Sequence, residues 1–359
     1  MSFTSFGVND AYAVKLWSKY LAAAEREYLD LAPLMGEGQN SIIQVKKETK
    51  KGAGDKVTCG LRVRLTGEGI SESETAEGNG ESLSIYSDSL VINELGHVAA
   101  AKSENTIDQQ RVPFNLRSEC KDALGEWWAD RKSASFFNQV CGYTPQTNTK
   151  YTGMNAVSAP AGTGRKLVAG AGNSNDEDLS SSDGFTLDLI DQAVEMAKVG
   201  DNMVRPINIG GQKKYVMYLH PYQVTSLRTN SASGQWQDIQ KAAIQGGQTT
   251  KNPIFSGALG EHNGVILRTS QDVTQGVNSS SSAAITTVRR AVLLGAQAAA
   301  MGFGQNNSGV NKYRWNEELL DHKRKLEVSA WSIFGIKKCV YNGADFGTVV
   351  VSTYGAASA

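Results

Sequence analysis

The residue types that could do chemistry are few in this chain and widely spaced. Four cysteines and four histidines occur among 359 residues, and no two cysteines form a CxxC pair. A zinc site needs ligands clustered at short spacing, so this distribution predicts no metal site and no cofactor. Scattered cysteines of this kind are typical of reduced thiols in a protein made in a cytoplasm. The eight residues are Cys59, Cys120, Cys141, Cys339, His97, His220, His262 and His322.

Three short patterns resemble ligand-binding motifs without completing one. The run GTGRK at residues 162–166 lacks the spacing of a phosphate-binding loop and has no clear strand before it or helix after it. Glu318 and His322 are four residues apart in NEELLDH and would share one face of a helix, but two groups alone cannot hold a metal ion. His220 precedes a proline at the end of a strand predicted over residues 214–219, where histidine is more often structural than catalytic.

Recognised catalytic patterns are also missing. The sequence contains no GxSxG, HExxH, Walker or Rossmann pattern. We therefore expect no catalytic residue and no enzyme activity. The opposing hypothesis is an enzyme with an unrecognised site around His220, Tyr222 and Arg228.

Composition indicates an ordinary folded protein without a strongly charged partner. Apolar residues make up 40% of the chain and charged residues 20%, enough for a packed core. Lysine plus arginine equals aspartate plus glutamate, 36 of each, so tight nucleic-acid binding is not expected, although loose contact with DNA would fit. Residues 1–9 lack the basic start and apolar run of a signal peptide, and no stretch approaches the roughly 20 apolar residues that span a bilayer.

The N-terminal segment reads as one amphipathic helix. Asn9 or Asp10 can cap it and Pro33 ends it. A helix with this narrow apolar stripe could pack on its own domain or act as an arm docked on a neighbour. The stripe consists of Val14, Trp17, Leu21, Ala24, Tyr28 and Leu31.

A polar ribbon is predicted next, from alternating residues over 41–66 and 83–92. Such a ribbon has too little core of its own and suits a subunit whose ribbon lies on a neighbour. Its charges are segregated, which favours electrostatic docking. The basic part holds Lys46, Lys47, Lys50, Lys51, Lys56, Arg62 and Arg64, and the acidic part, with no cation, holds Glu68, Glu72, Glu74, Glu77 and Glu81.

One long helix follows, starting with Pro113 in its first turn and ending before Gly142. Arg131 interrupts its apolar face and needs a partner if it is buried. The predicted face consists of Leu116, Cys120, Ala123, Leu124, Trp127, Ala134, Phe137 and Cys141.

The remainder is predicted to be a compact α+β domain inserted into the first domain. Residues 143–182 read as a long loop, and short helices and strands alternate up to Phe303. Strands are expected again from Leu326 onward, including the run FGTVVVSTY near the C-terminus, and these strands should pair with earlier elements.

Several long runs resemble one known family. The chain is similar to the major capsid proteins of the N4-like short-tailed bacteriophages, and the similarity extends from Val57 to the C-terminus. The runs include VTCGLRVRLTGEGISESETAEGN, ESLSIYSDSL, QQRVPFNLRSECKDALGEWWADR, YVMYLHPYQVTSLRT and KYRWNEELLDHKRKLEVSAWSIFGIKK. This resemblance implies the Hong Kong 97-type phage capsid fold, of class α+β.

On that resemblance the chain divides into five parts. They are an N-terminal arm (1–40), an extended β-ribbon loop (41–93), a peripheral domain (94–200) with a spine helix (111–140), an axial domain (201–310) and return strands of the peripheral domain (311–359).

The implied function is a major capsid protein that self-assembles as pentamers and hexamers into an icosahedral shell around double-stranded DNA, in a virion built in the host bacterial cytoplasm. Implied partners are other copies of the chain, a portal protein, the packaged DNA held weakly, and as further candidates separate scaffolding and decoration proteins; no membrane is implied. The alternative within the fold is the shell of an encapsulin-like nanocompartment. Inter-subunit contacts are expected at Trp17, Leu21, Lys46, Lys47, Glu68, Glu72, Glu74, Glu77, Arg117, Lys121, Arg131 and Lys132.

Overall fold

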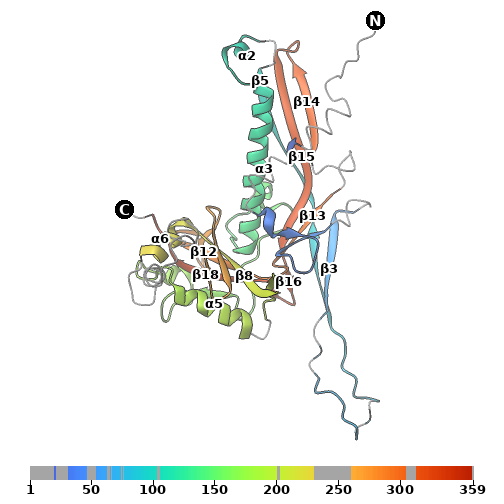
Figure 1. The fold of residues 1–359 in the computed structure, drawn as a ribbon, viewed down its shortest axis with the longest axis vertical. Coiled ribbons are helices and arrows are strands. Elements are labelled where there is room, and N and C mark those ends of the chain that lie inside the picture. The colour runs from blue at the N-terminus through green and yellow to red at the C-terminus, as the bar shows by residue number, and fades with distance from the viewer. Residues whose placement is uncertain are drawn as a thin grey trace.

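The fold is that of a computed structural model, in which two lobes and a projecting ribbon are organised around one long helix (Figure 1). The structure describes residues 20–21, 31–46, 54–62, 65, 67–73, 75, 77–102, 106–199, 203–229, 260–304 and 313–357.

The long helix, α3 (Leu116–Val140), is capped by Asn115, whose side chain accepts hydrogen bonds from the N–H groups of Arg117 and Ser118. The expected start at Arg111 is wrong. A separate short helix, α2 (Ile107–Arg111), ends there, and the next residue is extended because it precedes Pro113. Gly142, at φ 66°, follows the helix end in the left-handed conformation, as expected.

A six-stranded sheet lies along α3 and forms the upper lobe in Figure 1. Its centre is β15 (Lys325–Lys338), which pairs antiparallel with β5 (Asn93–Lys102) on one edge. The other edge of β15 takes β14 (Arg314–Leu320) and β13 (Ala299–Phe303). The parallel strands β2 (Ile43–Lys46) and β1 (Met35–Gly36) extend the sheet from β13, next to the turn η1 (Ala32–Leu34).

The face of α3 that packs on this sheet is centred on Trp128, which is fully buried against Tyr313 and Phe334. The predicted face is wrong at Ala123 and omits Trp128 and Lys132, which are fully buried. Ala123 is exposed, and Trp127 lies at the edge of the core, stacked on the ring of His97 at 4.4 Å. The error arises because the buried set includes the polar residue Lys132, which an apolar pattern cannot count.

The lower lobe is an eight-stranded sheet in the order β6-β18-β12-β8-β10-β9, with β11 on β12 and β7 on β8. Its helices are α5 (Leu187–Val199) and α6 (Pro221–Thr229), and α4 (Thr149–Thr152) and η3 (Asp176–Asp178) lie in the loops before it. The strands are β6 (Lys166–Val168), β7 (Ile207–Ile209), β8 (Gln212–Leu219), β9 (Glu261–His262), β10 (Val265–Thr269), β11 (Gln275–Val277), β12 (Ala284–Leu294) and β18 (Thr348–Tyr354).

Both faces of this sheet are covered, so its central strands are continuous apolar runs rather than alternating ones. Met217 of β8 and Leu293 of β12 belong to the core under α5. Their neighbours Tyr218 and Val292 belong to the core that includes the end of α3, where the rings of Phe137 and Tyr218 are 5.3 Å apart. The long helix therefore joins both lobes through one hydrophobic core.

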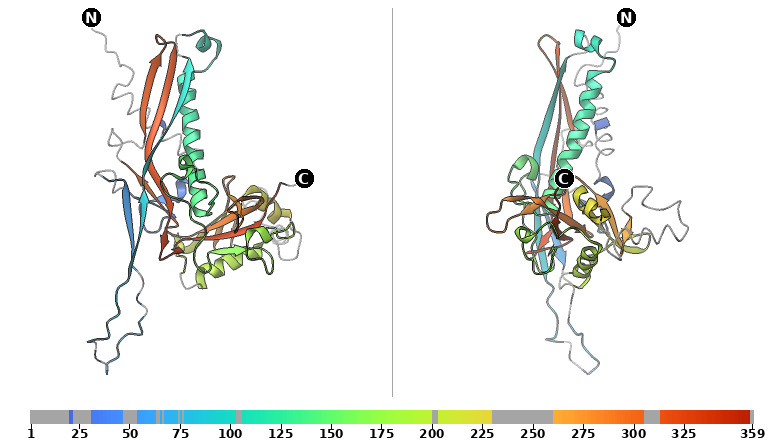
Figure 2. Two further views of the ribbon diagram at one scale, coloured as in Figure 1. Left: turned by 180° about the vertical axis from the view of Figure 1, so that it is seen from behind. Right: turned by 90° about the vertical axis from the view of Figure 1, so that its left-hand side faces the viewer.

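The ribbon consists of β3 (Lys56–Arg62), β4 (Ile85–Val91) and the loop between them. It points away from both lobes, at the opposite end of the molecule from α2 and the β14–β15 turn (Figures 1 and 2). A small hairpin, β16 (Val340–Tyr341) with β17 (Ala344–Asp345), lies near its base.

The expected division of the chain does not follow these sheets. β2 was expected in the ribbon but pairs with β13, because Ile42 and Ile43 are buried in the main core. β18 was expected with the return strands of the upper lobe but pairs with β12 and β6. β13 lies in the upper sheet although its sequence position falls in the expected axial range, and β6 and α5 lie in the lower lobe.

Candidate assembly surfaces

The ribbon presents apolar and acidic side chains far from any core of the chain. Leu65 is 56% exposed, Leu83 54% and Ile85 66%, and the carboxylates Glu68, Glu72 and Glu77 are also exposed. Glu81 is held locally, because its Oε2 accepts a hydrogen bond from Gly67 N–H at 2.7 Å. Glu74 lies outside the described residues. Large exposed side chains on a two-stranded ribbon indicate a contact surface rather than an independent fold.

The base of the ribbon is fixed to the body. Asn155 bonds both backbone groups of Val91, donating to its carbonyl at 2.7 Å and accepting from its N–H at 2.9 Å. Asp88 accepts a hydrogen bond from Val340 N–H at 3.1 Å and pairs with Lys337 Nζ. Gly335 permits this crossing, since a Cβ there would lie 2.3 Å from Val91 O. The ribbon is thus anchored at one end and projects at the other.

The spine was expected to offer cations to a neighbour's acidic ribbon, and two of these are engaged within the chain. Arg117 makes a bidentate pair with Glu317, with Nη2 2.8 and 2.6 Å from the two carboxylate oxygens. Lys121 Nζ lies 2.8 Å from Asp122 Oδ1. An arginine bonded to both oxygens of a buried carboxylate has fewer donors left for a neighbour, so the inter-subunit role of Arg117 stays a prediction.

Lys132 is not a surface residue at all. Its side chain is fully buried, and Nζ donates to Tyr313 Oη at 2.7 Å. The ammonium group also lies between 4.9 and 5.7 Å from the centroids of the Trp128, Phe303, Tyr313 and Phe334 rings. Aromatic faces and a hydroxyl stabilise the charge inside the core, which rules out the expected inter-subunit role.

Arg131 finds the partner that the sequence analysis required. Its guanidinium lies 3.8 Å from the centroid of Tyr151 and 4.9 Å from that of Trp127. The side chain is half-buried and remains on the outer side of α3. Of the four spine cations, burial excludes Lys132, and the expected contact roles of Arg117, Lys121 and Arg131 stay predictions.

Two of the four contact residues predicted near the N-terminus, Leu21 and Lys46, can be placed in the structure. Leu21 is fully buried in the main core with Cys120 and Leu124, so it packs within its own subunit rather than on a neighbour. Lys46 ends β2 beside Gly302 and is half-buried in the body, not on the ribbon. Trp17 and Lys47 lie outside the described residues.

A basic surface that the sequence analysis missed lies at the far end of the molecule. The turn between β14 and β15 (residues 321–324) and the first residue of β15, Lys325, are all exposed and read DHKRK; we call residues 321–325 the hairpin tip. Asp321, His322 and Lys323 all have left-handed φ angles of 53°, 51° and 70°, an uncommon run for residues other than glycine. The expected helix over Glu318 and His322 is wrong, because residues 314–320 form β14 and pair along β15.

The candidate enzyme site around His220 is a helix start. His220 Nδ1 accepts a hydrogen bond from Tyr222 N–H at 3.2 Å, and Gln223 Oε1 accepts one from His220 N–H at 2.9 Å. Burial, together with the nearby positive charge of Arg289, lowers the pKa of His220 to about 4. A general base works best with a pKa near the operating pH, so this neutral histidine supports α6 rather than acid–base catalysis.

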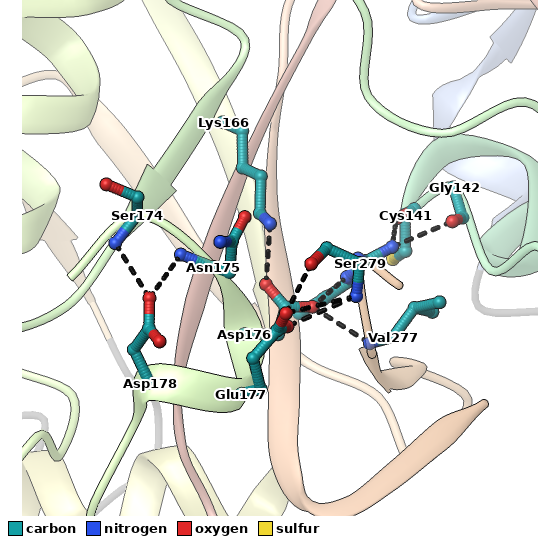
Figure 3. A network of polar contacts seen from close by, with 11 residues as sticks. Cys141, Gly142, Lys166, Ser174, Asn175, Asp176, Glu177, Asp178, Val277 and Ser279 are labelled. Atoms are coloured by element: carbon teal, nitrogen blue, oxygen red, sulfur yellow. Dashed lines mark hydrogen bonds and ion pairs between the residues drawn. The ribbon is translucent and has the colours of Figure 1, made fainter. Parts of the chain in front are cut away.

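The GTGRK run also has a structural role, because its lysine is part of an ion-pair network inside the subunit. Lys166 Nζ lies 2.9 Å from Asp176 Oδ1, and Asp176 Oδ2 accepts from Arg290 Nε at 2.7 Å (Figure 3). Arg290 also donates to the carbonyl oxygens of Cys141 and Gly142, at 3.3 and 2.8 Å. A lysine paired with a buried carboxylate is not available to a phosphate group. Within the described ranges, no three His, Cys, Asp or Glu side chains are grouped to hold a metal ion, and no helix is long and apolar enough to cross a membrane.

Comparison with known proteins identifies the family of this chain. Residues 5–357 match the family described as phage capsid protein. The chain belongs to the phage capsid protein family. Among curated relatives of this family member, the major capsid protein of Pseudomonas phage KPP25 is 24% identical over 383 aligned positions, which cover 98% of this chain and 97% of that protein.

Solved phage capsids share the fold. The capsid of Ralstonia phage GP4 matches with a TM-score of 0.76 and 28% identity over 100% of both chains. The Cyanophage Pam1 capsid asymmetric unit matches with a TM-score of 0.71 over 91% of this chain and 92% of that chain, at 18% identity. These matches confirm the α+β, Hong Kong 97-type capsid fold. The narrower N4-like resemblance stays a prediction.

Proposed function

We propose that this family member is a major capsid protein, a non-enzymatic subunit that self-assembles as pentamers and hexamers into an icosahedral shell around double-stranded DNA. The observation that carries the proposal is the full-length match to the GP4 phage capsid at a TM-score of 0.76. The ribbon supports it independently, because Leu65, Leu83 and Ile85 are more than half exposed and would be covered by a neighbouring subunit.

The size of the purified native protein tests this proposal. A shell subunit of 38.5 kDa should appear as pentamers, hexamers or closed particles of megadalton mass in negative-stain images and in sedimentation velocity. A monodisperse dimer or tetramer under every assembly condition would overturn it. Turnover of a small-molecule substrate by that oligomer would favour the enzyme hypothesis around His220.

Family membership favours a phage shell over an encapsulin-like nanocompartment. The two differ in content, so nuclease-protected DNA in purified particles supports the phage shell, and a co-purifying cargo enzyme supports the compartment. A zero formal net charge suits loose contact with DNA rather than tight binding by isolated subunits. A portal protein, and separate scaffolding and decoration proteins, complete the proposed set of partners for a virion assembled in the host cytoplasm.

The acidic ribbon is proposed to dock on a neighbouring subunit, as the sequence analysis expects, but at different cations. Arg117, Lys121 and Lys132 are engaged inside the subunit, whereas Lys323, Arg324 and Lys325 of the hairpin tip are exposed. Ribbon and hairpin tip lie at opposite ends of the elongated molecule (Figure 2). Opposite charges at opposite ends favour a head-to-tail contact between copies, since a subunit cannot pair them within itself.

Replacing Glu72, Glu74 and Glu77 together by Gln tests this contact. Exposed charge pairs contribute about 0–1 kcal/mol each, so the variant should stay folded while shell yield falls, with less difference at high salt. Wild-type yield and salt response in the variant would contradict the docking proposal while leaving the shell function intact.

A further inference from the structure

Two buried cysteines, Cys59 and Cys339, lie where the base of the ribbon crosses the end of β15. Cys59 is directly opposite Asp88 in the pairing of β3 with β4. Asp88 Oδ2 accepts a hydrogen bond from Val340 N–H at 3.1 Å, and Val340 follows Cys339 in the chain. Directly paired residues of antiparallel strands project from the same face of the ribbon. Cys59 therefore points toward the segment that carries Cys339.

Leu90 links the surroundings of the two cysteines a second time. Cys339 shares a hydrophobic cluster with Leu90 and Ala300. Leu90 is two residues from Asp88, so it lies on the same face of β4 and diagonally opposite Cys59. Cys59 is 8% exposed and Cys339 is 6% exposed, so solvent reaches neither freely.

The pKa shifts of Cys339 and Tyr341 also indicate that Cys59 lies near them. Burial, followed by the nearness of Cys59 and Asp88, raises the pKa of Cys339 to about 12. The same burial, together with Cys339 and Cys59, raises the pKa of Tyr341. A thiol with so high a pKa is mostly protonated at neutral pH and therefore reacts slowly as a nucleophile.

We propose that Cys59 and Cys339 form an intrachain disulfide that ties the base of the ribbon to the end of β15. Neither cysteine is in a disulfide in this structure. The oxidant is a small disulfide of the glutathione type. One thiolate attacks it, releasing a thiol, and the second thiolate then displaces the other half of the oxidant from the mixed disulfide. Overall the two cysteines lose two protons and two electrons, the protein S–S bond forms, and the oxidant is reduced to two thiols.

The buried position sets the rate of this reaction. Because the thiolate is the reacting species, oxidation should be slow at pH 7 and should speed up about tenfold for each pH unit while the pH stays below the thiol pKa. Once formed, the disulfide would be reduced slowly, because both sulfur atoms are buried and a reductant reaches them poorly. The ribbon would then be held to the body by a covalent bond as well as by Asn155 and Lys337.

The experiment treats the purified full-length protein with oxidised glutathione at pH 7, 8 and 9. The expected result is a loss of two protons in the intact mass with no glutathione adduct, and one crosslinked peptide pair that contains Cys59 and Cys339. The oxidised protein should also melt at a higher temperature than the reduced protein, and dithiothreitol should reverse both changes.

Three variants control this experiment. Cys120→Ser removes a buried thiol of the spine core and should leave the crosslink intact. Cys59→Ser and Cys339→Ser should each abolish it, and two separate variants guard against a folding defect in one. A stable glutathione adduct on either cysteine, a crosslink that joins a different pair, or unchanged thiols after complete oxidation of a model dithiol would overturn the proposal.

Discussion

Asp176 and Arg290 form a buried ion pair, 2.7 Å between Oδ2 and Nε, at the point where the end of α3 meets the eight-stranded sheet. Arg290 also donates hydrogen bonds to the carbonyl oxygens of Cys141 and Gly142, just beyond the end of α3. Asp176 also accepts a hydrogen bond from Val277 N–H at 2.9 Å. One carboxylate thereby holds the spine, β11 and β12 in a fixed relation, which is what a rigid two-lobed subunit requires.

Asp176→Asn should destabilise the subunit strongly. Burial alone would raise the pKa of Asp176, but Arg290, the Val277 N–H and Lys166 together lower it, so the carboxylate is charged in the folded state. Removing one partner of a buried pair typically costs ~3–5 kcal/mol, because the remaining charge is left uncompensated. Urea unfolding of the isolated subunit measures this loss. Glu195→Gln, an exposed change on α5, is the control and should stay within about 0.5 kcal/mol of wild type.

Acid should weaken the fold through His220. Burial and Arg289 lower the pKa of His220 from 6.5 to about 4 in the folded state. The unfolded chain therefore takes up the proton first, and stability is lost as the pH falls from about 6.5 toward 4, by up to ~3 kcal/mol. His220→Asn should flatten this part of the curve of unfolding free energy against pH. An unchanged slope in that variant would show that other groups carry the acid sensitivity.

Local sequence signals were enough for much of the fold. Gly142 marks the end of α3 as predicted, whereas the start lies at Leu116 after the Asn115 cap, three residues beyond the predicted first-turn residue Pro113. The apolar runs of β8, β12 and β18 indicate strands buried on both faces. These features need no knowledge of distant neighbours, and the resemblance to capsid proteins then supplied their arrangement.

Contacts between distant residues were not predictable in the same way. Lys132 looks like a surface cation in the sequence, and its partner Tyr313 lies 181 positions later. Arg117 is engaged by Glu317, 200 positions away. Glu318 and His322 have helical spacing, but the pairing of residues 314–320 with β15 overrides that local pattern. The sequence could not show that these cations are already paired inside the subunit, because their partners lie far away in the chain.

Gly335→Ala should disturb the anchoring of the ribbon. A Cβ at this position would lie 2.3 Å from Val91 O, a contact that backbone must move to relieve. Overpacking of this kind typically costs ~1–3 kcal/mol, and the shift would strain the hydrogen bonds between Val91 and Asn155. Gly60→Ala is the matched control, because a Cβ on that ribbon glycine meets nothing within 4 Å. Thermal melting of both variants, with hydrogen exchange at Val91, should separate them; equal behaviour would mean that the crossing adapts freely.

Charge reversal on both surfaces tests the proposed head-to-tail contact between copies more directly than a change on one surface. Glu72→Lys with Glu77→Lys reverses the ribbon, and Lys323→Glu with Arg324→Glu reverses the hairpin tip; all four side chains are exposed, so neither pair of changes should unfold the subunit. Each double variant brings like charges together and should lower shell yield at low salt.

Combining all four changes restores opposite signs across the contact, so yield should return toward wild type, and the defects of both double variants should shrink as salt screens the charges. Light scattering during assembly measures all four proteins under one protocol. Losses that simply add in the fourfold variant would show that the ribbon and the hairpin tip meet different partners. Recovery in the fourfold variant alone requires that the two surfaces touch, because a charge reversal rescues only the charge it faces.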